Sequence, residues 1–167
     1  MDYEEQKNKK HIEKVYLEKA INLLKICIGI LIFDGLTYLI PLLLYKDFDF
    51  GLIFEAVSFV FIILALNKLV SKDFIVGKRN IVIAMLSVGW LIVYDFINLI
   101  VNIKEVLFQI SIYYTSGDSY FYYLLPYLVD ITLIAIVSLL NMARSSVNRA
   151  DGTEKATTYV DTFYDEL

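Results

Sequence analysis

Long apolar stretches separated by short polar ones dominate the hydrophobic pattern of the chain. A hydrocarbon core of about 30 Å requires about 20 helical residues to cross it, and four of the stretches reach that length. They predict membrane spans at roughly residues 21–41, 50–70, 81–103 and 122–143. A helix in lipid satisfies its own backbone hydrogen bonds, so helices are preferred over strands. The pattern therefore predicts an all-α polytopic membrane protein, a bundle of four transmembrane helices.

A soluble four-helix bundle is the competing architecture, and it would require a polar stripe along each helix. The first and third stretches have no such stripe. Asp34 is the only charged residue between Cys27 and Tyr45, and Asp95 is the only one between Ile81 and Ile103. Composition favours the membrane, since 58% of the residues are hydrophobic and 20% are charged, against roughly 45–50% and about 25% in soluble domains.

The basic residues predict the orientation of the spans. Twelve of the fifteen lie before the first span, between the second and third, or after the fourth, whereas Lys46 and Lys104 lie on the other side and Lys25 falls inside the first span. By the positive-inside rule both termini are cytoplasmic. The first span is too long for the apolar core of a cleavable signal peptide and lacks an A-x-A-like site, so it is expected to remain as a membrane helix.

This orientation divides the chain into three parts. Residues 1–19 form a charged cytoplasmic arm, residues 20–143 the transmembrane domain and residues 144–167 a mobile cytoplasmic tail. The frequent use of Lys, Ile, Asn and Tyr suggests a bacterial plasma membrane. The expected partners are the lipid bilayer and either another membrane protein or further copies of the chain.

Three segments outside the spans each have two interpretations. The arm 1–19 is either a solvated, partly helical segment or one that lies on anionic headgroups. The aromatic connection 104–121 is an interfacial helix or a ligand lid, with the helix preferred because aromatic rings favour the headgroup level. The last stretch, 157–167, is a frayed terminus or a docking peptide for a cytoplasmic partner.

An internal similarity relates the first and third spans. Residues 30–40 read ILIFDGLTYLI and residues 91–101 read LIVYDFINLIV, so that Asp34 aligns with Asp95. The second and fourth spans resemble each other less well. The pattern suggests two parallel helical-hairpin repeats related by an axis along the membrane normal, an arrangement that some transporters use.

Each predicted span carries one carboxylate, at Asp34, Glu55, Asp95 or Asp130. At a rise of 1.5 Å per residue from the nearest cytoplasmic basic residue, all four lie roughly 20–24 Å from the cytoplasmic boundary. An ionised carboxylate at mid-bilayer costs about 2.5–3.5 kcal/mol, so these groups are expected to face one another, polar partners or water. Polar partners occur at helical spacing, namely Thr37, Tyr38, Ser58, Asn98, Asn102 and Tyr127.

This layer of acids has a functional and a structural interpretation. As a candidate ion or proton site, it would bind a proton or a metal cation, or attract a cationic substrate. As packing, its carboxyl groups would hydrogen-bond between helices, for about 1 kcal/mol or less each. The sequence does not distinguish the two.

Enzymatic and cofactor chemistry find little support. One cysteine, Cys27, and one histidine, His11, are too few for a disulfide framework, a Cys-built zinc site or a His cluster. Tyr94-Asp95 resembles half of the signature of intramembrane aspartyl proteases, but the other half, G-x-G-D, is absent around Asp34. No phosphate-binding glycine loop or nucleophile elbow is present, and the net charge of −4 gives no indication of nucleic-acid binding. We therefore expect no enzyme, cofactor or metal site.

Two functional hypotheses follow. The first is a small integral membrane protein that acts through protein or lipid contacts without catalysis. The second is a cation- or proton-linked carrier or channel that uses the acid layer. An open, wet cavity around Asp34 and Asp95 would favour the second, and a closed interior with an exposed apolar face would favour the first.

Overall fold

In the residues that the structure describes, the chain folds into four α-helices. The structure, a computed structural model, describes residues 3–46, 48–116 and 121–153. The helices are α1 (Tyr3–Tyr45), α2 (Gly51–Val70), α3 (Phe74–Ser116) and α4 (Phe121–Ala150). Within these helices the structure describes the backbone but not every side chain. The side chains left out are those of residues 3–7, 37–38, 40–41, 44–45, 102, 105–106, 109–116 and 121–130. The predicted all-α class and the number of helices are confirmed.

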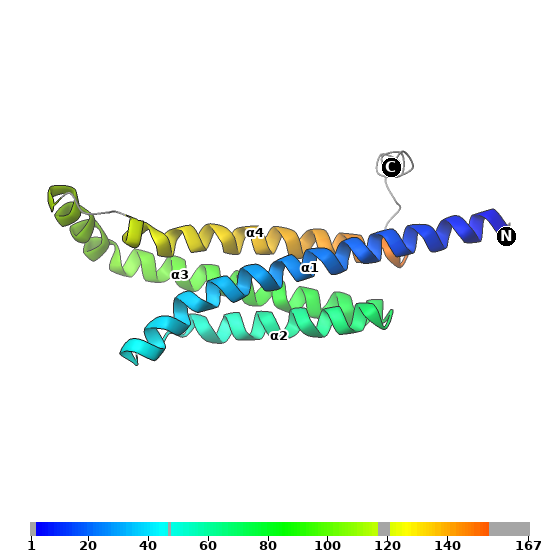
Figure 1. Cartoon of the computed structure of the whole chain (residues 1–167), viewed down its shortest axis with the longest axis horizontal. Coiled ribbons are helices and arrows are strands. Elements are labelled where there is room, and N and C mark those ends of the chain that lie inside the picture. Colours follow the sequence, from blue (N-terminus) through cyan, green and yellow to red (C-terminus); the bar gives the residue numbers. More distant parts are fainter. Residues whose placement is uncertain (1–2, 47, 117–120, 154–167) are drawn as a thin grey trace.

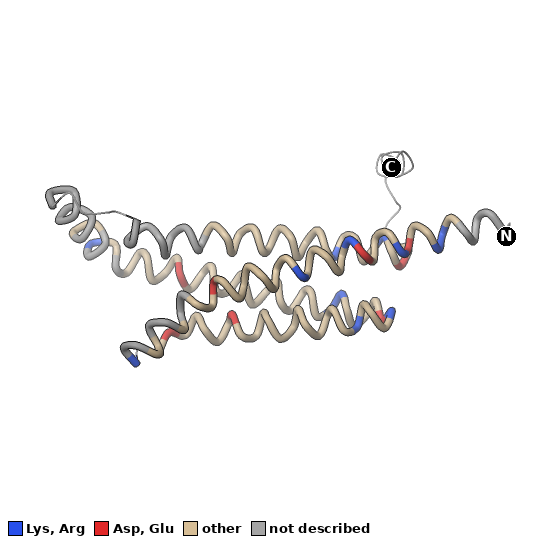
Figure 2. Tube along the Cα trace, in the orientation of Figure 1, with Lys and Arg blue, Asp and Glu red and all other residues tan. Residues whose placement is uncertain are grey.

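Successive helices run in opposite directions along one long axis (Figure 1). The start of α1, the α2–α3 connection and the end of α4 lie at one end, and the end of α1 and the start of α2 lie at the other. The first of these ends is called the basic end here, because it carries Lys68, Lys72, Lys78 and Arg149 (Figure 2). Within the described residues α1 and α3 each pack on α2 and on α4, while the pairs α1/α3 and α2/α4 do not come into contact.

Each helix buries a stripe of residues spaced three and four apart. This spacing places side chains on one face of an α-helix and directs them to a common core. Alanines recur in the stripes, at positions 20, 65, 84 and 143, where small side chains let helix backbones approach closely. The larger buried side chains include Leu24 and Leu31 of α1, Ile62 and Leu69 of α2, Val88 and Leu91 of α3, and Leu133, Ile136 and Leu140 of α4.

Three helical segments of the described chain are long and apolar enough to cross a membrane: Gly51–Val70, Phe74–Val101 and Ile131–Ala150. The 20 residues of α2 correspond to about 30 Å, the thickness of a hydrocarbon core. The predicted first span, 21–41, includes side chains outside the described residues and stays a prediction.

The helices extend beyond the predicted spans at three places. The arm 1–19 was expected to be partly helical, and from Tyr3 onward it is continuous with α1. Where the sequence suggested a separate interfacial helix after Lys104, α3 continues without a break to Ser116. α4 continues past the expected end at residue 143 to Ala150, and Val147 is fully buried. The suggested docking peptide, 157–167, lies outside the described residues.

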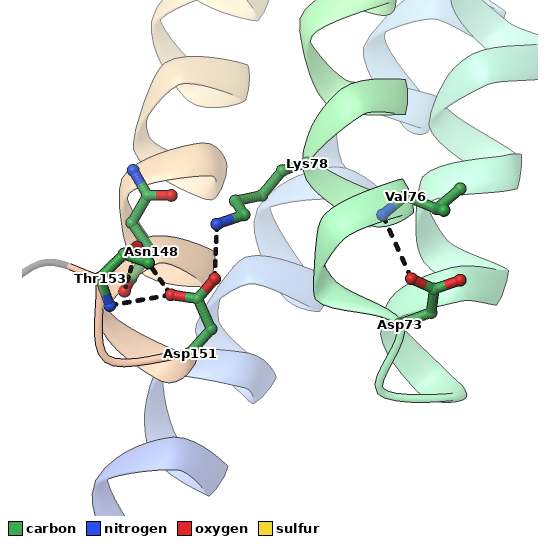
Figure 3. Close-up of polar contacts among 6 residues, drawn as sticks. All are labelled: Asp73, Val76, Lys78, Asn148, Asp151 and Thr153. Carbon is green, nitrogen blue, oxygen red and sulfur yellow. Dashed lines mark hydrogen bonds and ion pairs between the residues drawn. The ribbon is translucent and has the colours of Figure 1, made fainter.

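The connection between α2 and α3 is a tight turn. Lys72 has a positive φ of 60° and Asp73 N–H donates to the Lys68 carbonyl at 2.8 Å, as in a helix that ends on a left-handed residue. The Asp73 carboxylate then accepts a hydrogen bond from Val76 N–H at 3.2 Å, which caps the start of α3 (Figure 3). Gly77, one residue further, approaches Leu69 so closely that a β-carbon there would stand 2.7 Å from Cδ2.

Candidate functional site

The candidate acids lie on the buried stripes of the helices. Asp34 follows Leu31 at the next position of the α1 stripe, and Glu55 precedes Ser58 and Ile62 on α2. Asp34 is fully buried and Glu55 is 4% exposed. Asp95 of α3 is half-buried, and the side chain of Asp130 lies outside the described residues. In Figure 2 the acidic positions within the apolar parts of α1, α2 and α3 lie at a similar level along the long axis.

The Glu55 carboxyl group lies against the backbone of α1 at Gly35. A β-carbon at residue 35 would stand 2.6 Å from Oε1 and 2.9 Å from Oε2 of Glu55. Glycine is therefore what allows the carboxyl of α2 to reach the surface of α1 beside Asp34. Sequence reasoning selected Asp34 but missed Gly35, although a small residue beside a buried acid is a recognisable sign of close helix approach.

The electrostatic surroundings of Glu55 are acidic. Among the described residues, Asp34 and Asp95 act on its carboxyl through space. Its Oε2 atom is buried and has no hydrogen-bond partner in the part of the chain that the structure describes. The Gly35 backbone donates a hydrogen bond to the carboxyl group, but a buried carboxylate oxygen that has no donor or cation loses its hydration without compensation. The interface between α1 and α2 thus contains a carboxyl group whose polar requirements the described side chains do not meet.

The predicted polar partner of Glu55 donates elsewhere. Ser58 is fully buried, and its hydroxyl donates to the Phe54 carbonyl at 2.8 Å, within α2. The same carbonyl accepts a second hydrogen bond, also 2.8 Å long, from Ser87 of α3. Sequence reasoning did not select Ser87, whose bond ties α3 to α2 next to Glu55.

Of the remaining predicted polar partners, only Asn98 has a described side chain. Asn98 is half-buried on α3. Four other predicted partners have side chains outside the described residues, namely Thr37, Tyr38, Asn102 and Tyr127. Their relation to the acids stays a prediction. Among the described residues no group of three His, Cys, Asp or Glu side chains is placed to hold a metal ion.

A second polar cluster closes the basic end. Lys78 of α3 forms an ion pair with Asp151, with 2.5 Å between Nζ and Oδ2. Thr153 N–H donates to Oδ1 of the same carboxylate at 3.0 Å, and the Thr153 hydroxyl lies 2.7 Å from that oxygen (Figure 3). Partial burial by itself would raise the pKa of Asp151, but the hydrogen bonds from Lys78 and Thr153 outweigh it and the pKa is lowered from its ordinary value.

The first helix joins this end through an aromatic contact. The guanidinium of Arg149 lies over the ring of Tyr16, 5.6 Å from its centroid, within the range of a cation–π interaction. Tyr16 is 2% exposed, and its hydroxyl has no hydrogen-bond partner among the described residues. A further ion pair, between Lys72 and Glu13, connects the α2–α3 turn to α1 at 2.6 Å. The basic end is therefore held by contacts from α1, α3 and α4.

The outward face of α2 is apolar. A shallow, open hollow runs along it and is lined by Leu52, Ile53, Ala56, Val57, Val60 and Phe61. Ile53 and Val60 are 47% and 51% exposed. Neither Asp34 nor Glu55 lines this hollow, because both carboxyl groups face the interior. Comparisons of the chain with protein-family models, with curated proteins and with solved structures find no significant match.

Proposed function

We propose that the chain is an integral protein of a bacterial plasma membrane that acts through contacts of its helices with lipid or with another membrane protein. In this proposal the four helices form a transmembrane bundle, both termini are cytoplasmic and the basic end faces the cytoplasm. The clustering of Lys and Arg at one end supports this orientation. The contact function includes no catalysis, cofactor or metal.

The observation that carries the proposal is the distribution of polar and apolar surface. Asp34 and Glu55 are sequestered in the interior, whereas large apolar side chains of α1, α2 and α3, such as Phe33, Val60 and Trp90, are 63%, 51% and 62% exposed. Apolar surface of this extent on a soluble protein would be expected to aggregate, and lipid or a partner helix would cover it. A carrier or channel built on the acid layer would instead require a wet path to the carboxyl groups.

The two-repeat hypothesis is part of the proposal. α1 and α3 each have 43 residues, and each is followed by a shorter antiparallel helix. The shared direction of α1 and α3, each followed by an antiparallel helix, supports two parallel hairpins.

Photo-crosslinking in native membranes tests the contact function. A photoreactive residue is introduced at Val60, in the α2 hollow, and in a matched variant at Ile75, an exposed apolar position near the basic end. The proposal predicts an adduct of discrete size, with lipid or with a protein, at Val60 and not at Ile75. Equal, diffuse labelling at both positions contradicts a contact through α2. Extraction of the chain from membranes by alkaline carbonate contradicts the membrane assignment itself.

A further inference from the structure

The Glu55 carboxyl group is buried between helices, and one of its oxygens has no hydrogen-bond partner among the described residues. The residue is 4% exposed, its carboxyl touches the α1 backbone at Gly35, and the oxygen in question is Oε2. The nearest hydroxyl on its own helix, that of Ser58, donates its single proton to Phe54 O. The hydrogen bond from the Gly35 backbone therefore compensates the carboxyl group only in part.

The groups that face Glu55 are known from each helix that packs on α2. From α1 the ionisable group is Asp34 and from α3 it is Asp95, while Tyr94 of α3 lies against the ring of the neighbouring Phe54. On α4, which packs on α1, the ionisable residues with described side chains are Arg144 and Arg149, and Arg149 lies at the basic end with Tyr16. The charges of described residues that act on Glu55 are thus of its own sign.

We infer that Glu55 and Asp34 together form a binding site for one proton, held between α1 and α2. Uptake of a proton from water changes the pair from two negative charges to one and gives it a donor, and no other bond changes. Two like charges in a low dielectric repel strongly, and one proton removes that repulsion. Among the described residues, no set of three metal-binding side chains is placed to hold a metal ion.

The bound proton makes the packing of α1 on α2 dependent on pH. Loss of the proton would leave two buried anions across the Gly35 contact, and the two helices would separate or admit water. This inference is independent of the contact function proposed above, since a chain that acts through the outer face of α2 can hold the proton or lack it. Val60 crosslinking tests that function, and the titration below tests the proton.

The test follows the thermal unfolding midpoint of the full chain in detergent between about pH 5 and about pH 9. Wild type is compared with Glu55→Gln, Asp34→Asn and Glu18→Gln, the last altering a carboxylate whose side chain is 63% exposed. The native state holds a proton that the unfolded chain releases, so the wild-type midpoint falls as the pH rises. Glu18→Gln keeps the full fall, whereas Glu55→Gln and Asp34→Asn each lose at least half of it.

Three results overturn the inference. They are a wild-type midpoint that does not fall, a full fall retained by both buried-site variants, and a midpoint that follows the Na⁺ concentration and not the pH. If the variants fail to fold, a measurement on the wild-type chain alone still tests the inference. The infrared spectrum of the folded chain at neutral pH should contain the carbonyl stretch of a neutral carboxylic acid, and its absence also overturns the inference.

Discussion

Glu55 of α2 and Gly35 of α1 are in contact through the carboxyl group of one and the backbone of the other. The space that a β-carbon would occupy at residue 35 is taken by Oε1, 2.6 Å away. An acid at this position of the buried stripe therefore needs glycine opposite it. The pair fixes how closely α1 and α2 approach at the level of Asp34.

Gly35→Ala is expected to destabilise the chain despite the higher helix propensity of alanine. Alanine is favoured over glycine by about 1 kcal/mol in a helix interior, but the new methyl group must displace the buried Glu55 carboxyl. We expect a net loss of about 1 kcal/mol, in the range found for overpacked cores. The measurement is the thermal or denaturant midpoint of the two proteins in the same detergent.

Gly29→Ala is the matched control, because among the described residues no atom beyond the neighbouring helix turn lies within 4 Å of the β-carbon it would add. It should be neutral or stabilising. In a Glu55→Ala background Gly35→Ala should also become neutral or stabilising, and a double-mutant cycle then measures the coupling of the two residues. Equal effects of Gly35→Ala in both backgrounds would show that the carboxyl does not matter.

Ser87→Ala should weaken the packing of α3 on α2. The Ser87 hydroxyl crosses between the helices to the Phe54 carbonyl at 2.8 Å, and the Ser58 hydroxyl remains on that carbonyl after the change. Since the acceptor stays satisfied, we expect a modest loss of about 0.6 kcal/mol, as for interhelical hydrogen bonds in membranes. Ser138→Ala, which removes a hydroxyl bonded within α4, should leave the midpoint unchanged. A loss of the same size in both variants would mean that the interhelical bond contributes nothing.

Asp151→Asn should destabilise the basic end at neutral pH and have less effect in acid. The ion pair with Lys78 is largely buried, with side chains 22% and 14% exposed, and its charged hydrogen bond is worth about 2 kcal/mol. Because the folded pKa of Asp151 is lowered, this stability is present above the unfolded pKa of about 3.9 and is lost as the pH falls through the folded value.

The measurement for this pair is the difference in midpoint between wild type and Asp151→Asn as a function of pH. The difference should be constant above about pH 5 and shrink below about pH 4. Lys72→Ala is the comparison, because Lys72 forms its ion pair with Glu13 from a side chain that is 66% exposed. Exposed ion pairs contribute roughly 0–1 kcal/mol, so Lys72→Ala should cost less. A difference that grows in acid would contradict the assignment of the charge to Asp151.

Tyr16→Phe should be neutral or stabilising. The Tyr16 hydroxyl is buried without a hydrogen-bond partner among the described residues, and an unsatisfied buried polar group costs about 1–3 kcal/mol. The ring and its contact with Arg149 remain in the variant, whereas Tyr16→Leu removes the cation–π contact. A clear loss of stability in Tyr16→Phe, measured by the thermal midpoint, would show that the hydroxyl has a partner after all.

The sequence predicted the helices better than their ends. Runs of apolar residues identified α2, most of α3 and most of α4, because composition and length alone define a helix long enough to span lipid. The ends depend on local capping and on neighbours. The helix around Val147 extends past the polar boundary at Arg144 because its buried stripe continues there and meets the core.

The acids were found because a carboxylate in an apolar run is conspicuous, and the three-four spacing explains why Asp34 and Glu55 face the interior. Their individual surroundings could not be derived in the same way. The Ser58 hydroxyl donates to Phe54 O within its own helix, and the packing of α3 on α2 brings a second donor, Ser87, to the same carbonyl. The role of Gly35 depends on which helix lies opposite it, which a single sequence does not state.

The Lys78–Asp151 ion pair has a consequence for how the molecule is made. The two residues are 73 positions apart in the chain. Lys78 therefore emerges from the ribosome long before Asp151 is synthesised. This ion pair can form only after all of α3 and α4 have been synthesised. Nascent chains arrested ahead of Asp151 should therefore expose Lys78 to protease or acylating reagents, and release of the completed chain should protect it.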